Sequence, residues 1–186
     1  MNYIALAATA ALTLSGAAFA QDTTTENPMV GGAPMMADMN IVENAANSAD
    51  HTTLVAAVQA AGLVETLSGE GPFTVFAPTN DAFDMISDET LEQLMMPENK
   101  AQLAQILSCH VVAADADAMA IRGMIDDDGG THPVPTVGGC TLQATYEGDE
   151  IMLTDENGRT ATVTIANVQQ SNGVIHVIDR VLLPQQ

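Results

Sequence analysis

Residues 73–83, which read FTVFAPTNDAF, decide how the centre of the fold is built. The first five of them are apolar or β-branched and follow the turn formers of residues 69–72, which predicts a short buried strand. Pro78 closes that strand, and Thr79 is then placed to cap a new helix. Asp81 falls in the first turn of this helix, where a carboxylate interacts favourably with the helix dipole. The segment therefore predicts a strand that passes directly into a helix.

Helical patterns lie on both sides of this segment. Upstream, Leu54 and Val58 share one face of a predicted helix, with Asp50 as its N-cap and Gly62 as its stop. Downstream, Pro97 suits the first turn of another helix, because proline lacks an N–H that a helix start would leave unpaired. From residue 39 to the C-terminal third, helices are therefore expected to dominate.

The C-terminal third changes its period. Apolar and polar residues alternate over residues 140–146, 150–154 and 160–168, which is typical of strands. Asn157-Gly158 predicts a tight hairpin turn, because this pair supplies the positive φ angles that such a turn needs. The nearly all-aliphatic residues 174–183 predict a central strand. Helices first and an antiparallel meander last indicate an α+β domain.

A second stretch, residues 172–184, reads NGVIHVIDRVLLP. Together with residues 73–83 it resembles the two signature boxes of the fasciclin domain, in the expected order and separation. The resemblance covers residues 39–186 and implies an α+β fold, a fasciclin-type β-wedge of two sheets flanked by a cluster of α-helices. It also implies a non-catalytic role in adhesion or extracellular recognition, without a cofactor.

The resemblance implies structural roles for the residues of the two boxes and for a histidine between them. These residues are Phe73, Pro78, Thr79, Asn80, Asp81, Phe83, His110, Asn172, Gly173, His176 and Asp179. Between the boxes the family usually has a Tyr-His pair, whereas this chain has Cys109-His110. The tyrosine region is implicated in integrin-dependent adhesion by animal members, so the cysteine argues against that activity here.

The sequence carries none of the common catalytic motifs. It has no GxSxG elbow, no phosphate-binding loop and no HExxH helix. His176 lies on an apolar run and is expected to be a hydrogen-bonded core histidine, and His110 receives the same interpretation. We therefore expect that the protein is not an enzyme.

The N-terminus predicts export. Residues 1–20 carry an apolar run that ends in Ala18-Phe19-Ala20, the small-x-small pattern of a signal peptidase site. Residues 21–38 mix Thr, Pro, Gly and Met without a period, so they are expected to form a flexible leader. No later segment is long and apolar enough to anchor the chain, so no integral membrane segment is expected after cleavage. The protein is thus predicted to be secreted or periplasmic.

Cys109 and Cys140 are the two cysteines of the chain. An oxidising compartment permits a disulfide between them, which would stabilise the fold by about 3–4 kcal/mol. Two buried, unpaired thiols are the alternative, because the sequence does not place their Cα atoms within bridging distance.

The charge of the chain is strongly one-sided, with 24 acidic against four basic residues and a formal net charge of −20. Such a chain repels nucleic acid and anionic lipid, so the expected partners are surface proteins or polysaccharides. Tyr146 and the loop of residues 122–135 are exposed-looking candidates for a binding surface. Calcium binding is the alternative function, because residues 126–130 (DDDGG), Asp115 and Asp117 supply hard oxygen ligands.

Overall fold

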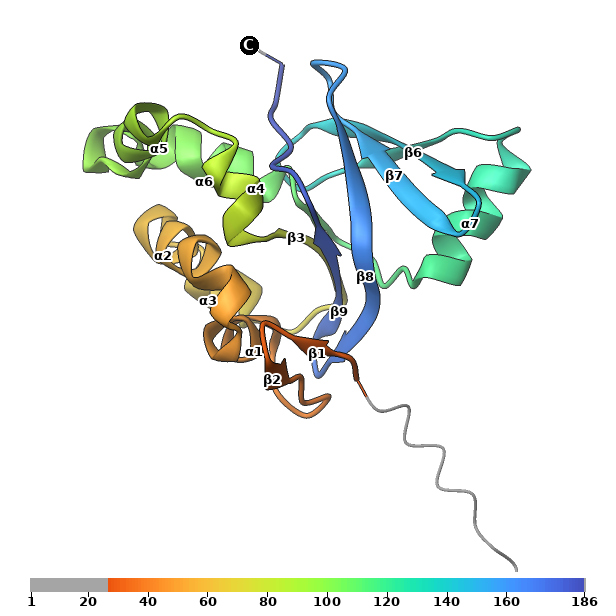
Figure 1. The fold of residues 1–186 in the computed structure, drawn as a ribbon, viewed down its shortest axis with the longest axis horizontal. Helices are drawn as coiled ribbons and strands as arrows, with labels where there is room; N and C mark the ends of the chain where they lie inside the picture. Colours follow the sequence, from red (N-terminus) through yellow and green to blue (C-terminus); the bar gives the residue numbers. More distant parts are fainter. Residues whose placement is uncertain (1–26, 186) are drawn as a thin grey trace, which may run out of the picture.

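The computed structural model describes residues 27–185, so the predicted signal sequence of residues 1–20 lies outside the described part. The described chain starts with a short hairpin and continues with helices around one strand (Figure 1). These elements are β1 (Met29–Val30), β2 (Ala33–Pro34), α1 (Ile41–Asn47), η1 (Ala49–His51), α2 (Thr52–Ala61), α3 (Val64–Leu67), β3 (Phe73–Pro78), α4 (Asn80–Asp84), α5 (Asp88–Met95), η2 (Pro97–Asn99) and α6 (Lys100–Ser108).

The C-terminal part consists of strands and one further helix. Its elements are β4 (Val111–Val112), α7 (Ala118–Asp127), β5 (His132–Pro135), β6 (Thr141–Glu147), β7 (Glu150–Thr154), β8 (Thr160–Gln170) and β9 (Gly173–Ile178). The alternating segments near residues 140–168 thus form β6, β7 and β8, as their period predicted.

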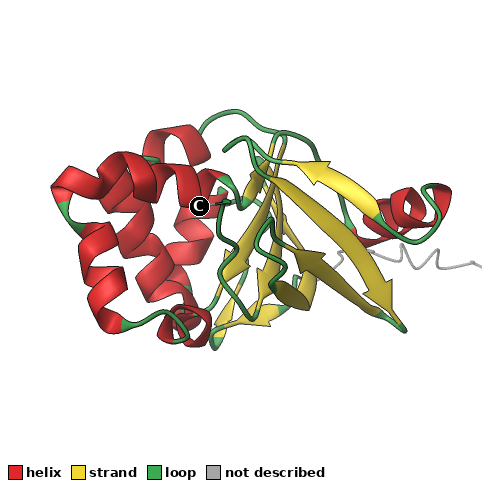
Figure 2. Ribbon diagram, turned by 90° about the horizontal axis from the view of Figure 1, so that it is seen from above, coloured by secondary structure: helices red, strands yellow, loops and turns green. Residues whose placement is uncertain are grey.

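Seven strands form one sheet in the order β4-β3-β9-β8-β7-β6-β5. The two motif strands β3 and β9 are parallel neighbours, whereas the other neighbours in this sheet are antiparallel. The start of β8 pairs with β7 and the remainder pairs with β9, with register shifts between Val163 and Val168. The sheet bends along β8 into two leaves, which form the expected wedge (Figure 2). We term β4, β3, β9 and the end of β8 the helix-side leaf, and the start of β8 with β7, β6 and β5 the outer leaf.

The helix-side leaf buries a different core on each of its faces. Val75 and Ala77 of β3 pack in the core with the helices, whereas Phe76 belongs to the core inside the wedge. Val177 and Ile178 of β9 divide in the same way, because successive side chains of a strand point to opposite faces. Coverage of both faces explains why β9 reads as an aliphatic run.

Helices α1 to α6 cluster against one face of the helix-side leaf, and α7 lies apart from them beside the outer leaf (Figures 1 and 2). Ile121 and Ile125 of α7 join Leu142 and Leu153 of the outer leaf in the wedge core. Within residues 27–185, none of the helices has the length and apolar character needed to cross a membrane.

Helix α2 begins differently from the prediction. Asp50 lies in η1, and His51 precedes α2 without a side-chain capping bond. Because a 3-10 turn occupies the position where the cap was expected, the prediction that Asp50 is the N-cap of α2 was wrong. Gly62 ends α2 in the left-handed conformation, with a φ of 72°, as predicted.

The last strand is shorter than the predicted residues 174–183. It ends at Ile178. Further along the chain, backbone N–H groups donate to side-chain acceptors. The Leu182 N–H donates to His110 Nε2 over 2.9 Å, and the Leu183 N–H donates to Asp155 Oδ2 over 3.0 Å. Side-chain acceptors therefore replace a neighbouring strand over this segment.

The turn between β7 and β8 also departs from the prediction. Only Gly158 of the Asn157-Gly158 pair has a positive φ, which is 78°. The Asp155 side chain accepts the N–H groups of Asn157 and Arg159, over 2.9 and 3.0 Å. These side-chain bonds add to two backbone bonds of the turn, from the Asp155 N–H to the Arg159 carbonyl over 2.8 Å and from the Gly158 N–H to the Asp155 carbonyl over 3.0 Å.

The predicted leader of residues 21–38 is in part a packed hairpin. From Asn27 onward the chain is described, and Val30 and Met35 are buried in the core under the helices. The Asn27 amide donates to the Gln169 carbonyl over 2.7 Å and accepts the Gln169 N–H over 2.9 Å. Because β7 pairs only with the start of β8, the edge of β8 at Gln169 remains available for these contacts.

Candidate recognition site at the sheet seam

The two edge strands of the sheet, β4 and β5, both contribute residues to one cavity, and we term the space between these strands the seam. One end of the seam is closed by backbone bonds. The Val137 N–H donates to the Val111 carbonyl over 2.8 Å, and the Gly138 N–H donates to the carbonyl at the end of α6 over 3.0 Å. The disulfide between Cys109 and Cys140 lies beside these bonds, with Cα atoms 5.4 Å apart. The closed end is thus joined by backbone and covalent contacts.

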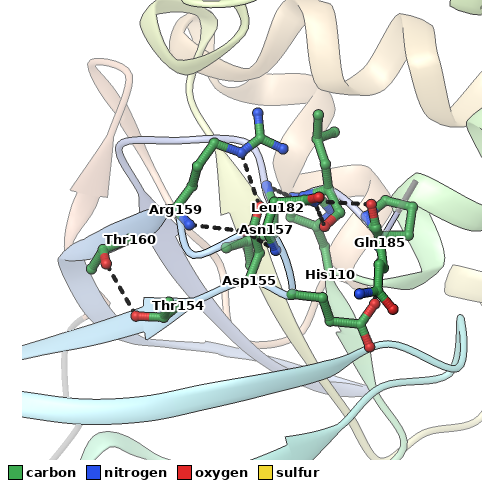
Figure 3. Close-up of polar contacts among 11 residues, drawn as sticks. His110, Thr154, Asp155, Asn157, Arg159, Thr160, Leu182 and Gln185 are labelled. Carbon is green, nitrogen blue, oxygen red and sulfur yellow. Dashed lines mark hydrogen bonds and ion pairs between the residues drawn. The ribbon is translucent and has the colours of Figure 1, made fainter.

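His110 contributes to the closed end (Figure 3). Its ring is buried, with Nδ1 2.9 Å from the Ile106 carbonyl and Nε2 2.9 Å from the Leu182 N–H. Because Nε2 accepts a bond, the proton of the neutral ring lies on Nδ1 and is donated to Ile106. Burial lowers the pKa of His110 to about 4, against an ordinary value of 6.5. A neutral imidazole therefore connects α6 with the C-terminal segment.

Asp155 is the other side chain that secures this end (Figure 3). Its carboxylate is fully buried and accepts the N–H groups of Asn157, Arg159 and Leu183. The Arg159 Nε also donates to it, over 3.2 Å. Asn157 completes the contact by donating from Nδ2 to the carbonyls of Leu183 and Pro184, each over 3.0 Å. The turn after β7 thereby binds the C-terminal segment to the outer leaf.

The opposite end of the seam is open and contains a cavity of about 190 Å³. Its walls come from β3, β4, β5 and α7, and the lining residues include Thr74, Phe76, Val112, Ile121, Met124, Val134 and Pro135. The Thr74 hydroxyl donates to the Ala114 carbonyl over 2.7 Å and accepts the Ala116 N–H over 2.9 Å. Since the hydroxyl hydrogen of Thr74 is already donated to Ala114, this residue offers the cavity no free donor, and the wall is essentially apolar.

The seam edge of β5 is poorly suited to pairing with a further strand. Pro133 and Pro135 pair opposite Gln143 and Thr141 of β6, and neither proline has an N–H. Alternate residues of an antiparallel strand direct their polar groups to the same edge, so the prolines occupy the positions that face the seam. This edge offers carbonyl groups without donors, which protects it against strand addition.

Helix α7 covers the open end. It begins at Asp117, whose side chain accepts the Ala120 N–H over 2.7 Å. After the helix, Asp128 Oδ2 lies 2.6 Å from His132 Nδ1 at the start of β5. This contact holds the end of the helix beside the seam.

A polar cluster joins α7 to the β6–β7 hairpin. Arg122 Nη2 donates to the Gly148 carbonyl over 2.6 Å and to Asp149 over 3.1 Å. The guanidinium carbon of Arg122 lies 5.1 Å from the centre of the Tyr146 ring, a cation–π geometry. The Tyr146 hydroxyl donates to Asp126 over 2.6 Å, and this bond raises the pKa of Tyr146. The structure therefore brings together the exposed-looking candidates Tyr146 and the loop of residues 122–135.

Three of the acidic residues considered for calcium have other contacts. Asp126 accepts from Tyr146, Asp128 contacts His132, and Asp117 caps α7. In the part of the chain that the structure describes, no group of three Asp, Glu, His or Cys side chains is arranged to hold a metal ion.

The first box contributes Thr74 and Phe76 to the cavity wall, and its later residues connect α4 with its neighbours. Asn80 Oδ1 accepts the Thr53 N–H over 3.0 Å, and Asn80 Nδ2 donates to the Ala49 carbonyl over 2.9 Å. Asp81 is exposed in the first turn of α4, where Thr79 provides the side-chain cap. The box residues that are buried or half-buried are Phe73, Pro78, Thr79, Asn80 and Phe83.

The start of the second box connects both motif strands. Asn172 Nδ2 donates to the carbonyls of Leu67 and Gly69, over 2.8 and 2.9 Å. Gly173 pairs with Phe73 and has a φ of 153°. A Cβ on Gly173 would lie 1.9 Å from the Phe73 carbonyl oxygen, so only glycine permits this approach of β9 to β3.

The remaining second-box residues support the wedge. His176 is buried, with Nε2 2.9 Å from the Ala116 carbonyl and Nδ1 3.4 Å from the Asn167 N–H. Burial lowers the pKa of His176, so the ring is neutral at ordinary pH. Asp179 accepts the Thr162 N–H over 2.7 Å. Because Ala116 lines the cavity, His176 fixes part of the cavity wall.

Two other hollows are less suited to a ligand. An open, polar hollow of about 490 Å³ surrounds Asn172, but the amides of Asn172 and Gln170 are already bonded within the protein. An apolar cavity between α1, α2 and the sheet measures only about 30 Å³. The open end of the seam therefore remains the candidate site.

Sequence reasoning found part of this site and missed the rest. It singled out Tyr146 and the loop of residues 122–135, because they look exposed and loops at the ends of sheets commonly carry function. It did not identify Asp155, since an aspartate in a turn gives no sign that it will be buried. It did not identify the cavity either, because the walls come from segments far apart in the chain.

Comparison with known families supports the resemblance that the two motifs in β3 and β9 indicated. The family model of the fasciclin domain matches residues 49–184. Protein sll1483 of Synechocystis is 44% identical over 163 residues, which cover 88% of this chain and 83% of that protein. The cell surface glycolipoprotein MPB83 of Mycobacterium bovis is 32% identical over 83% of this chain and 64% of its own length.

A solved structure shares the fold. The pair of FAS1 domains from the insect cell adhesion molecule fasciclin I matches with a TM-score of 0.69 at 17% identity. The match covers 78% of this chain and 51% of that one, so this chain spans about half the length of the domain pair. The likeness confirms the predicted α+β fold.

Proposed function

Because this chain belongs to the fasciclin domain family, we propose that it is a non-catalytic module for adhesion or recognition outside the cytoplasm. Partners are proposed to bind at the open end of the seam. One observation carries this assignment, namely an apolar cavity between two unpaired sheet edges, with exposed carboxylates around it. Surface loops on a well-packed scaffold commonly carry recognition.

The proposed location draws on the relatives and on the disulfide. One relative is named a cell surface glycolipoprotein, and the solved structure belongs to a cell adhesion molecule. A disulfide persists in an oxidising compartment, which suits a secreted or periplasmic protein. If the signal sequence is cleaved as proposed, N-terminal sequencing of the exported protein will start at Gln21.

The charge restricts the kind of partner. With a net charge of −20, the protein favours neutral or cationic surface proteins and neutral polysaccharides. Anionic polysaccharides would require divalent ions between the two negative surfaces. Salt dependence of binding therefore separates these partner classes.

A binding assay tests the proposal. The purified protein is applied to immobilised envelope fractions and polysaccharides at low and high salt, with calcium and with a chelator. Asp115→Lys combined with Asp127→Lys reverses two exposed charges, one between the lining residues Ala114 and Ala116 and one at the end of α7, whereas Glu89→Lys combined with Glu92→Lys makes the same change on the exposed face of α5. We expect saturable binding that the first variant weakens about tenfold and the second leaves unchanged. Folded protein that binds no fraction would contradict the proposed function.

A further inference from the structure

We propose that the cavity at the open end of the seam accepts one aliphatic or aromatic side chain from a cationic segment of a partner protein. This inference rests on the proposed recognition function and specifies the chemistry of the partner. It follows from the size, the walls, the access and the charge of the cavity, taken in turn.

Size and polarity define the group that fits. The cavity measures about 190 Å³, and an apolar cavity of about 150 Å³ is known to hold a benzene ring. A leucine, methionine or phenylalanine side chain therefore fits. Phe76 forms part of the wall, and the hydroxyl of Thr74 already donates to Ala114. A polar side chain would lose its bonds to water here without replacement.

The surroundings show how the group enters. Ala114 and Pro135 line the cavity and are exposed, so the cavity opens to the surface between the two edge strands. The prolines of β5 remove the N–H donors from its seam edge, and β4 is only two residues long. A partner therefore cannot extend the sheet over a useful length. It enters with a side chain, not as an added strand.

The charge around the cavity indicates which residues should flank the inserted side chain in the partner. Exposed carboxylates occur in the segments that line the cavity: Asp115 and Asp117 adjoin the lining residue Ala116 in the chain, and Asp128 contacts the lining residue His132. The nearby cation Arg122 is bonded to Asp149 and to the Gly148 carbonyl. Lysine or arginine residues beside the inserted side chain would meet these carboxylates, which favours a cationic peptide over a polysaccharide.

Three short peptides test the proposal against the full chain labelled with ¹⁵N. The first is acetyl-Lys-Gly-Phe-Gly-Lys-amide, the second has alanine in place of phenylalanine, and the third has glutamate in place of both lysines. We expect the first peptide to shift the amide resonances of Ala114, Met124 and Val134 saturably. Loss of the phenyl ring should weaken binding about tenfold or more, and the glutamate peptide should not bind. Equal binding of the first two peptides would overturn the proposal.

Variants that fill the cavity give an independent test. Ala114→Phe places a ring at the mouth, and Ala113→Phe adds the same ring at an exposed neighbour that does not line the cavity. We expect Ala114→Phe to abolish binding of the first peptide and Ala113→Phe to retain it. Ala116→Leu repeats the test from another wall position if Ala114→Phe does not fold, as judged by circular dichroism.

The two proposals fail in different ways. If Ala114→Phe binds envelope fractions like the unmodified protein, the recognition function stands and the role of the cavity is overturned. If the phenylalanine peptide binds at the cavity while no envelope fraction does, the cavity binds as proposed and the recognition function at the envelope is contradicted.

Discussion

The two ends of the seam between β4 and β5 differ in how the neighbouring segments are joined. At the closed end, backbone bonds, a disulfide and the side chains of His110 and Asp155 join segments from four parts of the chain. At the open end, no such bonds are described between the edge strands, and an apolar cavity lies between them instead. That end is held by side-chain contacts of α7 and of the segment before it, and by the packing of Ile121 and Ile125 in the wedge core.

From this difference we expect the closed end to determine the stability of the domain and the open end to determine its binding. Buried polar groups stabilise a fold when each has its partners, and they are costly to leave without them. The closed end satisfies this condition, so a change there should destabilise the whole domain. The open end leaves an apolar surface that a partner can cover, so a change there should alter binding and leave stability nearly unchanged.

The largest effect is expected at Asp155. Asp155→Ala leaves the backbone N–H groups of Asn157, Arg159 and Leu183, and the Arg159 side chain, without their acceptor. We expect the free energy of unfolding to fall by about 3–5 kcal/mol, because four hydrogen bonds to this carboxylate are lost and each contributes about 1 kcal/mol. Urea unfolding measures this change. The matched variant Asp127→Ala at the open end should stay within about 0.5 kcal/mol of the unmodified protein, and equal losses in both variants would remove the contrast between the two ends.

Loss of the disulfide should have the next largest effect. The bond closes a loop with a sequence separation of 31 residues. Replacing Cys109 and Cys140 together by alanine should lower the free energy of unfolding by about 3–4 kcal/mol, because the unfolded chain regains the freedom that the loop had removed. Thiol titration of the denatured, unreduced protein provides the control, since two reactive thiols would show that the bond is not formed in solution.

Acid should weaken the closed end through His110. The unfolded chain takes up a proton near pH 6.5, whereas the buried ring does so only near pH 4. Stability is therefore complete above pH 6.5, and this contribution is lost as the pH falls from about 6.5 to about 4, by about 3 kcal/mol in total. The pKa values of His51 and His176 are also lowered by burial, so they act in the same direction.

Two measurements check this pH dependence. Urea unfolding between pH 7.5 and 5 follows the loss of stability in a range where most carboxylates stay ionised. An NMR titration of the histidine ring protons gives the midpoint of His110 directly. A midpoint near 6.5 for His110 would contradict the structural role of its neutral ring.

The smallest effect is expected at Arg122. Arg122→Ala removes an ion pair to Asp149, whose side chain is 99% exposed, and the contact with the Tyr146 ring. Exposed ion pairs and cation–π contacts each contribute about 1 kcal/mol or less, so the total loss should stay near 1 kcal/mol. Urea unfolding measures it, and Arg122→Lys separates the charge from the stacking contact. A loss as large as that of Asp155→Ala would show that the open end also carries the stability of the domain.

Local patterns in the sequence were sufficient for much of the fold. The motif of residues 73–83 indicated a strand followed by a helix, Gly62 marked the end of α2, and alternation located β6, β7 and β8. These features depend on neighbouring residues, because capping and side-chain alternation act over a few positions. The two boxes together also indicated the family.

The seam depended on the tertiary structure. Its edges are residues 111–112 and 132–135, its closed end needs Asp155 and Leu183, and its cavity has walls from β3, β4, β5 and α7. No local pattern reports the burial of Asp155 or the end of β9 at Ile178, because both depend on which distant groups lie beside them. A cavity is the space that remains after packing, so it is decided only when all of the surrounding elements are in place.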